Sequence, residues 1–162
     1  MMQQNDPGTP KQQLRAMNVL CTALMSGVVI FLIIIVALVK WNDGGFGKDS
    51  EVNKYFSVAV IIIAAICLIS GIVSYKKRID NIPPEILKLD AKLDYYRAAL
   101  ILYFASCEGG SLFAIIVIFL TGNFLLVVVV AILLVAMFLM RPVKQRVVDE
   151  LKLNWEEEQQ LN

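Results

Sequence analysis

The stretch AALILYFASCEGGSLFAIIVIFLTGNFLLVVVVAILLVAMFLM, residues 98–140, contains a single charged residue, Glu108, and one short polar break at residues 121–123. A helix needs about 20 apolar residues to cross a hydrocarbon layer, and the runs on the two sides of the break approach or exceed that length. The run after the break is rich in valine, which would also suit a buried strand of a soluble protein. Its continuity instead predicts a helix, because a segment in lipid must satisfy its own backbone hydrogen bonds.

Two more apolar runs precede this stretch, at residues 17–39 and 55–74. The chain of 162 residues is 58% hydrophobic and only 18% charged, whereas soluble domains have about 45–50% apolar and about 25% charged residues. We therefore predict an all-α integral membrane protein, a four-helix bundle of two parallel helical hairpins. The expected helices cover residues 17–39, 55–74, 98–120 and 124–140. The first run is longer than the apolar core of a signal peptide.

These helices would form a transmembrane domain at residues 14–142, between two terminal segments. Residues 1–13 are polar and contain the helix-breaking cluster Asp6-Pro7-Gly8-Thr9-Pro10, which predicts a disordered or loosely attached tail. In residues 143–162, apolar side chains recur every four residues at Val143, Val147, Leu151 and Trp155. This spacing predicts an amphipathic cytoplasmic helix. Two positions for it stay open: on the membrane surface, or packed on the protein's own cytoplasmic loop.

The basic residues predict the orientation of the bundle. Twelve of the 15 lysines and arginines lie before the first apolar run, between the second and third runs, or after the fourth run. Basic residues near helix ends favour the cytoplasmic side. We therefore expect both termini in the cytoplasm, and we expect the membrane to be the inner (plasma) membrane of a bacterium.

The first and third runs match each other without gaps at an offset of 82 residues. The matching pairs include Arg15 with Arg97, Gly27 with Gly109, and Phe31 with Phe113. This internal repeat predicts a duplicated hairpin, with halves related by an axis along the membrane normal. Each run also has a pair of small residues four positions apart, a spacing that permits close helix approach. We expect the first and third helices to meet through these pairs: Ala23 with Gly27, and Ala105 with Gly109.

Glu108 is the best candidate for a functional residue, because its repeat mate is Ser26 and it lies near the middle of its run. A carboxylate at a helix centre in a bilayer costs roughly 2.5–3.5 kcal/mol on insertion scales. Three roles stay open. Glu108 is protonated or ion-bound in a proton or cation pathway; or it is hydrogen-bonded to a neighbouring subunit or to Ser26, Ser106 or Ser111; or it faces a basic residue of a partner protein. We expect no basic residue of this chain within the membrane.

Several classes of function are disfavoured by the composition. The chain has no histidine, so histidine catalysis and histidine metal ligands are excluded. The three cysteines lie within apolar runs and have no CxxC spacing, which is typical of small buried hydrophobic residues. A net charge of +1 gives no reason to expect nucleic acid as a partner. We expect no enzyme activity, no catalytic residue, no metal site and no cofactor.

The segment from Arg97 to Gly122 resembles the ion-binding helix of the proteolipid subunits of rotary ATPases, with Ala105 and Glu108 in mid-helix. The duplicated four-helix arrangement is similar to the V-type version of these subunits. The resemblance implies a homo-oligomeric ring in which Glu108 binds a proton or Na⁺. The chain departs from that family in its longer charged connection at residues 75–97, and because Glu108 lies on the first helix of its hairpin.

These observations predict a small, non-enzymatic integral membrane subunit whose midplane carboxylate is a proton- or cation-responsive centre or a packing centre. Its expected partners are the lipid bilayer and either further copies of itself, as a homo-oligomer, or a membrane protein complex. The alternative is a proton-coupled transporter of ions or small molecules that acts as a dimer. In both hypotheses Glu108 is the residue on which the function depends.

Overall fold

The computed structural model describes residues 9–41, 50–83 and 89–161, which form helices and no strand. The all-α expectation is therefore confirmed for the described part. The polar stretch 40–54 predicts a loop, but its described ends, residues 40–41 and 50–54, are helical. Residues 42–49 and the first eight residues of the predicted tail lie outside the described residues. The elements in chain order are α1 (Pro10–Trp41), α2 (Ser50–Asp80), α3 (Leu89–Thr121), the 3₁₀ turn η1 (Phe124–Leu126), α4 (Val127–Leu139), α5 (Lys144–Leu151) and α6 (Trp155–Gln159).

Three of these helices, α1, α2 and α3, are long and apolar enough to cross a membrane. The predicted fourth helix is shorter than expected, since α4 has 13 residues and follows the 3₁₀ turn. At 1.5 Å per residue, α4 is about 20 Å long, whereas a hydrocarbon core is about 30 Å thick. The segment from Phe124 qualifies as a span only when it is combined with α5, from which it is bent by 72°.

The long helices also extend beyond the predicted apolar runs, and their ends follow known capping rules. Helix α1 begins at Pro10, so residues 10–13 are helical and do not belong to a tail. Proline is favoured at the first helical position because it has no N–H that would need a partner there. Helix α3 ends before Gly122, whose positive φ of 69° is readily adopted only by glycine. The Asn123 amide then donates a 3.0 Å hydrogen bond to the Ser57 hydroxyl of α2.

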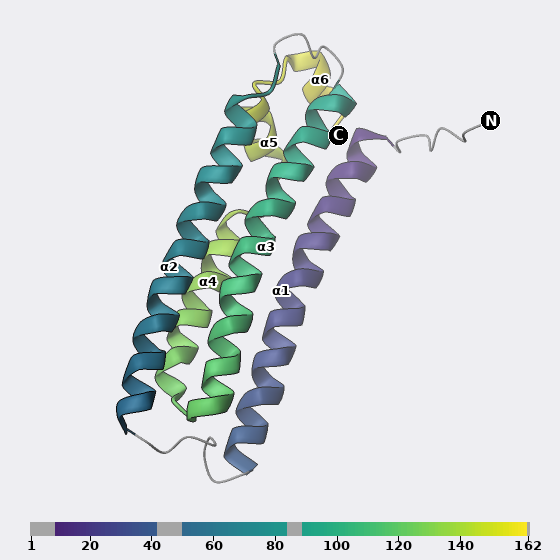
Figure 1. Cartoon of the computed structure of the whole chain (residues 1–162). Coiled ribbons are helices and arrows are strands. Elements are labelled where there is room, and N and C mark those ends of the chain that lie inside the picture. Colours follow the sequence, from purple (N-terminus) through teal and green to yellow (C-terminus); the bar gives the residue numbers. More distant parts are fainter. Residues whose placement is uncertain (1–8, 42–49, 84–88, 162) are drawn as a thin grey trace, which may run out of the picture.

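Helix α3 is the centre of the molecule and contacts α1, α2 and α4. In Figure 1, α1 and α3 run in the same direction, and α2 and α4 run in the opposite direction. The expected meeting of the first and third helices is therefore present, although α1 lies beside the bundle and not at its centre. Residues of α1 and α3 that face each other are about 80 positions apart in the sequence. For example, Leu20 and Leu24 of α1 line the same small cavity as Ile101 and Phe104 of α3.

Helices α2 and α3 pack closely against each other, and two glycines permit it. A Cβ atom built at Gly71 would lie 3.2 Å from the Ser106 Cβ, and one at Gly110 would lie 3.2 Å from the Cys67 Cβ. Contacts this short leave little room for a larger side chain. Gly71 and Gly110 are therefore the residues that let α2 and α3 pack tightly.

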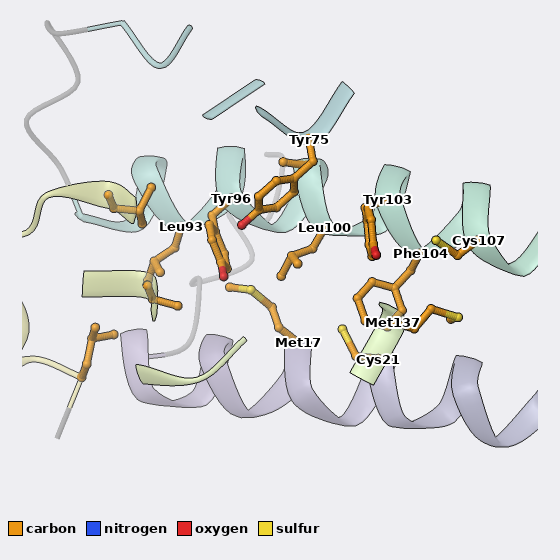
Figure 2. Close-up of a cluster of buried hydrophobic side chains, with 14 of the residues drawn as sticks. Met17, Cys21, Tyr75, Leu93, Tyr96, Leu100, Tyr103, Phe104, Cys107 and Met137 are labelled. Carbon is orange, nitrogen blue, oxygen red and sulfur yellow. The ribbon is translucent and has the colours of Figure 1, made fainter. Parts of the chain in front are cut away.

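The predicted small-residue pairs lie elsewhere. Ala23, Gly27, Ala105 and Gly109 are all exposed, and a Cβ atom built at Gly27 or Gly109 would have no other atom within 4 Å. The prediction that these pairs form the contact between α1 and α3 is wrong. The contact instead buries larger side chains, such as Met17 and Cys21 of α1 beside Leu100 and Phe104 of α3 (Figure 2).

The C-terminal segment folds back against the ends of α2 and α3. Lys152 has a positive φ of 48° and interrupts the predicted single helix, which gives the two short helices α5 and α6. Val147 and Leu151 are buried in one apolar cluster with Leu93 and Tyr96 of α3. Two residues of the predicted apolar face, Val147 and Leu151, thus pack on the protein itself, whereas Val143 and Trp155 are exposed. Figure 1 shows α5 and α6 at the end of the bundle beyond α4; we call this the α5–α6 end.

Candidate functional site

Glu108 lies at the edge of the exposed face of α3, next to the positions that face α1: Phe104, one turn earlier, lines a small cavity together with residues of α1. Glu108 is partly buried, and Ala105 and Gly109 beside it are exposed. Within the described ranges, the Glu108 carboxylate has neither a hydrogen bond nor an ion pair. In an apolar environment an unpaired carboxylate is costly.

The three serines that were expected to support Glu108 form bonds within their own helices. Ser26 donates to the Thr22 carbonyl at 2.8 Å, Ser106 to the Leu102 carbonyl at 2.9 Å, and Ser111 to the Cys107 carbonyl at 2.9 Å. Serine hydroxyls in helices commonly bond in this way to the carbonyl four residues earlier. The structure therefore gives no support to the hypothesis that Glu108 is bonded to these serines.

A basic residue lies closer to the middle of the bundle than the sequence predicted. The Arg141 guanidinium donates a 3.0 Å hydrogen bond to the Thr22 hydroxyl and lies 5.5 Å from the ring centroid of Phe138. Thr22 is already inside the apolar run of α1. Arg141 reaches this depth because α4 is short, and the Asn18 amide of α1 fixes the chain there by donating to the Pro142 carbonyl at 2.7 Å.

Arg141 borders a groove of about 630 Å³ between α1 and α4. The groove is apolar except for Arg141 and the hydroxyls of Thr22 and Ser26, which lie one turn apart on α1. Its volume is within the usual range of ligand pockets, about 300–1,000 Å³. Sequence analysis missed this arrangement, although polar residues at 18, 22 and 26 on one face of an otherwise apolar helix were a signal for it.

Glu108 and this groove lie at the same depth in the bundle. Residues of α1 and α3 that contact each other are about 80 positions apart, and Ser26 and Glu108 are 82 positions apart. The two helices run in parallel (Figure 1). The open carboxylate on α3 and the polar floor of the groove beside α1 are therefore at nearly equal heights along the bundle axis.

A second polar cluster lies at the α5–α6 end. The buried Tyr75 hydroxyl of α2 donates to the Glu150 carboxylate of α5. Glu150 also pairs with Arg146 one turn earlier, at an N–O distance of 3.5 Å, and Arg146 donates to the Leu139 carbonyl at the end of α4. Tyr75 is also in edge-to-face contact with Tyr103 of α3, with ring centroids 6.3 Å apart. This cluster fixes α5 against the three longer helices.

Helix α6 is attached to α3 by an ion pair. The Lys92 ammonium lies 2.6 Å from the Glu157 carboxylate, which also accepts a bond from the Asn154 N–H. Partial burial works to raise the pKa of Glu157, but the hydrogen bonds from Lys92 and Asn154 outweigh it, and the pKa lies below its ordinary value of 4.5. The ionised form of Glu157 therefore stabilises the position of α6.

Within the described ranges, no group of three or more histidine, cysteine, aspartate or glutamate side chains could hold a metal ion. The three cysteines are free thiols, and Cys21 and Cys107 are buried. Comparison with known proteins found no family model, no curated protein and no solved structure that matches the chain. Proposals about function therefore depend on the chemistry of Glu108 and of the grooves.

Proposed function

We propose that the chain is a non-enzymatic integral membrane subunit that assembles with further copies of itself, with Glu108 at the contact between neighbours. The observation that carries the proposal is the open carboxylate in the middle of a long apolar helix. A helix of this length and composition favours insertion into a bilayer, and there the carboxylate needs a partner. No described residue of its own chain supplies one.

The groove between α1 and α4 supports a second copy as the source of that partner. It presents a guanidinium and two hydroxyls at the depth of Glu108, which suits a carboxylate. An Arg–carboxylate pair that is shielded from water is held more strongly than one at a surface. The exposed small residues Ala105 and Gly109 beside Glu108 would let a neighbouring helix approach closely.

A contact of this kind joins two different faces of the same molecule. The Glu108 face of one copy would meet the α1–α4 groove of the next copy, which is a heterologous contact. Heterologous contacts produce closed rings or open chains and do not stop at a two-fold dimer. We therefore propose an assembly larger than a dimer, with Arg141 of each copy facing Glu108 of its neighbour.

The proposed orientation places the α5–α6 end and both termini in the cytoplasm. Twelve of the 15 basic residues lie on that side of the proposed membrane, and such an excess favours the cytoplasmic face. Reporter domains fused to the C-terminus test this, since a reporter active only in the cytoplasm is expected to be active there.

The assembly is tested by measuring the mass of the protein in mild detergent, in which one chain contributes 18.1 kDa. We expect the wild type to exceed twice that mass, and both Glu108→Leu and Arg141→Leu to yield mostly monomer. The exchange variant that carries Glu108→Arg together with Arg141→Glu should recover part of the assembly, because it restores the opposite charges.

Asp94→Leu is the matched control, since Asp94 is an exposed carboxylate on the same helix; it should keep the wild-type mass. A monomeric wild type, or an unchanged mass in Glu108→Leu, would reject the proposal. Proton flux into liposomes addresses the transporter hypothesis: a Glu108→Gln variant that assembles normally but loses a flux present in the wild type would favour transport over assembly.

A further inference from the structure

A second groove, of about 780 Å³, opens between α2 and the end of α4 at the α5–α6 end. It exists because α4 stops at Leu139 and the chain then turns by 72° into α5. The side of α2 above this turn is consequently not covered by a fourth long helix. The volume is within the range that holds small ligands.

The walls of this groove change from apolar to charged along the bundle axis. Toward the middle of the bundle it is lined by apolar side chains, including Leu68 and Ile72 of α2 and Met140 beyond α4. Lys76, one turn after Ile72, begins the charged part of the lining. Because the predicted apolar run of α2 ends at residue 74, this change falls at the expected membrane boundary. An amphiphile with its tail in the bilayer has the same order of polarity.

In the charged part of the groove, the more buried polar side chains already pair with one another, whereas the exposed charged side chains at its edge have no such partner among the described residues. The Glu150 carboxylate accepts a hydrogen bond from the Tyr75 hydroxyl and forms an ion pair with Arg146. On the rim are four exposed charged residues, and none of them has an ion pair or hydrogen bond to another described residue: Lys76 and Asp80 from α2, Asp149 from α5, and Lys152 after α5. Two cations and two anions are therefore available to a ligand.

We propose that this groove binds one phospholipid with a zwitterionic amine headgroup, of the phosphatidylethanolamine class. The phosphate lies near Lys76 and Lys152, the ammonium near Asp80 and Asp149, and one acyl chain follows the apolar wall. A purely anionic headgroup would meet the two carboxylates as well as the lysines, and like charges repel. The inference rests on the membrane insertion proposed above but not on the proposed assembly.

The test is lipid titration followed by native mass spectrometry of the detergent-solubilised protein, with phosphatidylethanolamine and phosphatidylglycerol of identical acyl chains. We expect the wild type to retain the ethanolamine lipid at least about fivefold more tightly. Lys76→Gln should weaken that binding about fivefold, the order expected for one lysine near a headgroup. Lys77→Gln is the matched control, because Lys77 is exposed and does not line the groove.

A second variant blocks the tail end of the groove. Ile72→Trp should reduce retention of either lipid, because the larger ring fills the space beside α2. Equal or tighter binding of phosphatidylglycerol, no retained lipid, or equal loss in Lys76→Gln and Lys77→Gln would each overturn the inference. None of these three outcomes would change the mass of the assembly, so failure of the lipid inference is distinguishable from failure of the proposed function. A protein that stays soluble without detergent would refute both.

Discussion

Two neighbouring glycines of α3, Gly109 and Gly110, lie on faces with opposite surroundings. A side chain added at Gly110 would meet Cys67 of α2 and Leu133 of α4 at 3.2–3.4 Å, but one added at Gly109 would meet nothing. The Gly110 face includes the buried Cys107 and Ser111, and the Gly109 face includes the partly buried Glu108. One face of α3 is thus packed against other helices, and the face of Gly109 is open.

The two faces therefore have different expected roles: the covered face stabilises the single chain, and the open face is available to a partner. On the covered face, the Ser111 hydroxyl donates to the Cys107 carbonyl, and the buried Tyr96 hydroxyl is the polar group without a hydrogen-bond partner among the described residues. On the open side, the Glu108 carboxylate has neither a hydrogen bond nor an ion pair among the described residues. Changes on the covered face should therefore alter the stability of the monomer, and changes on the open face should alter association.

The largest expected effect follows from filling the covered face. Gly110→Leu should lower the free energy of unfolding of the detergent-solubilised monomer by about 1–3 kcal/mol or more, because the side chain overlaps Cys67 and Leu133 and α2 must move away. Gly109→Leu, one residue earlier, should not lower it and should raise it by up to about 1 kcal/mol, because leucine has a higher helix propensity than glycine and meets no atom there. Denaturant unfolding measures both, and equal losses in the two variants would contradict the difference between the faces.

A smaller effect is expected where α5 joins the covered face. Tyr75→Phe removes the hydroxyl that donates to Glu150 but keeps the ring contact with Tyr103. Hydrogen bonds to charged groups contribute about 1.5–3 kcal/mol, so the unfolding free energy should fall by roughly that amount. Tyr95→Phe is the control, because Tyr95 is 41% exposed. A loss no larger than that of the control would mean that the Glu150 contact does not stabilise α5.

The smallest effect concerns α6 and depends on pH. Because the pKa of Glu157 is lowered in the folded protein, its contribution is complete above 4.5 and is lost as pH falls through the folded value. The difference in thermal midpoint between wild type and Glu157→Gln should therefore be small at pH 7 and vanish near pH 3. Glu156→Gln, at an exposed neighbouring position, should show no such change. A difference that persists at pH 3 would exclude this ion pair as its source.

The sequence by itself determined the helical class and the lengths of the apolar segments. These follow from local physics, since a long uninterrupted apolar run must satisfy its own backbone hydrogen bonds wherever it lies. The sequence also identified Glu108, because a lone charge in such a run needs no knowledge of neighbours to be recognised. The parallel course of α1 and α3 agrees with the register of the repeat, although the duplication itself stays a prediction.

Only the tertiary structure decided which face of each helix is covered. Small residues four positions apart occur on every face of an alanine- and glycine-containing helix, so spacing could not distinguish the exposed Gly27 and Gly109 from the packed Gly71 and Gly110. The depth of Arg141 likewise depends on where α4 ends and on its contact with Thr22, a residue 119 positions away in sequence. Contacts between distant segments set both features, and these contacts exist only once the helices have packed.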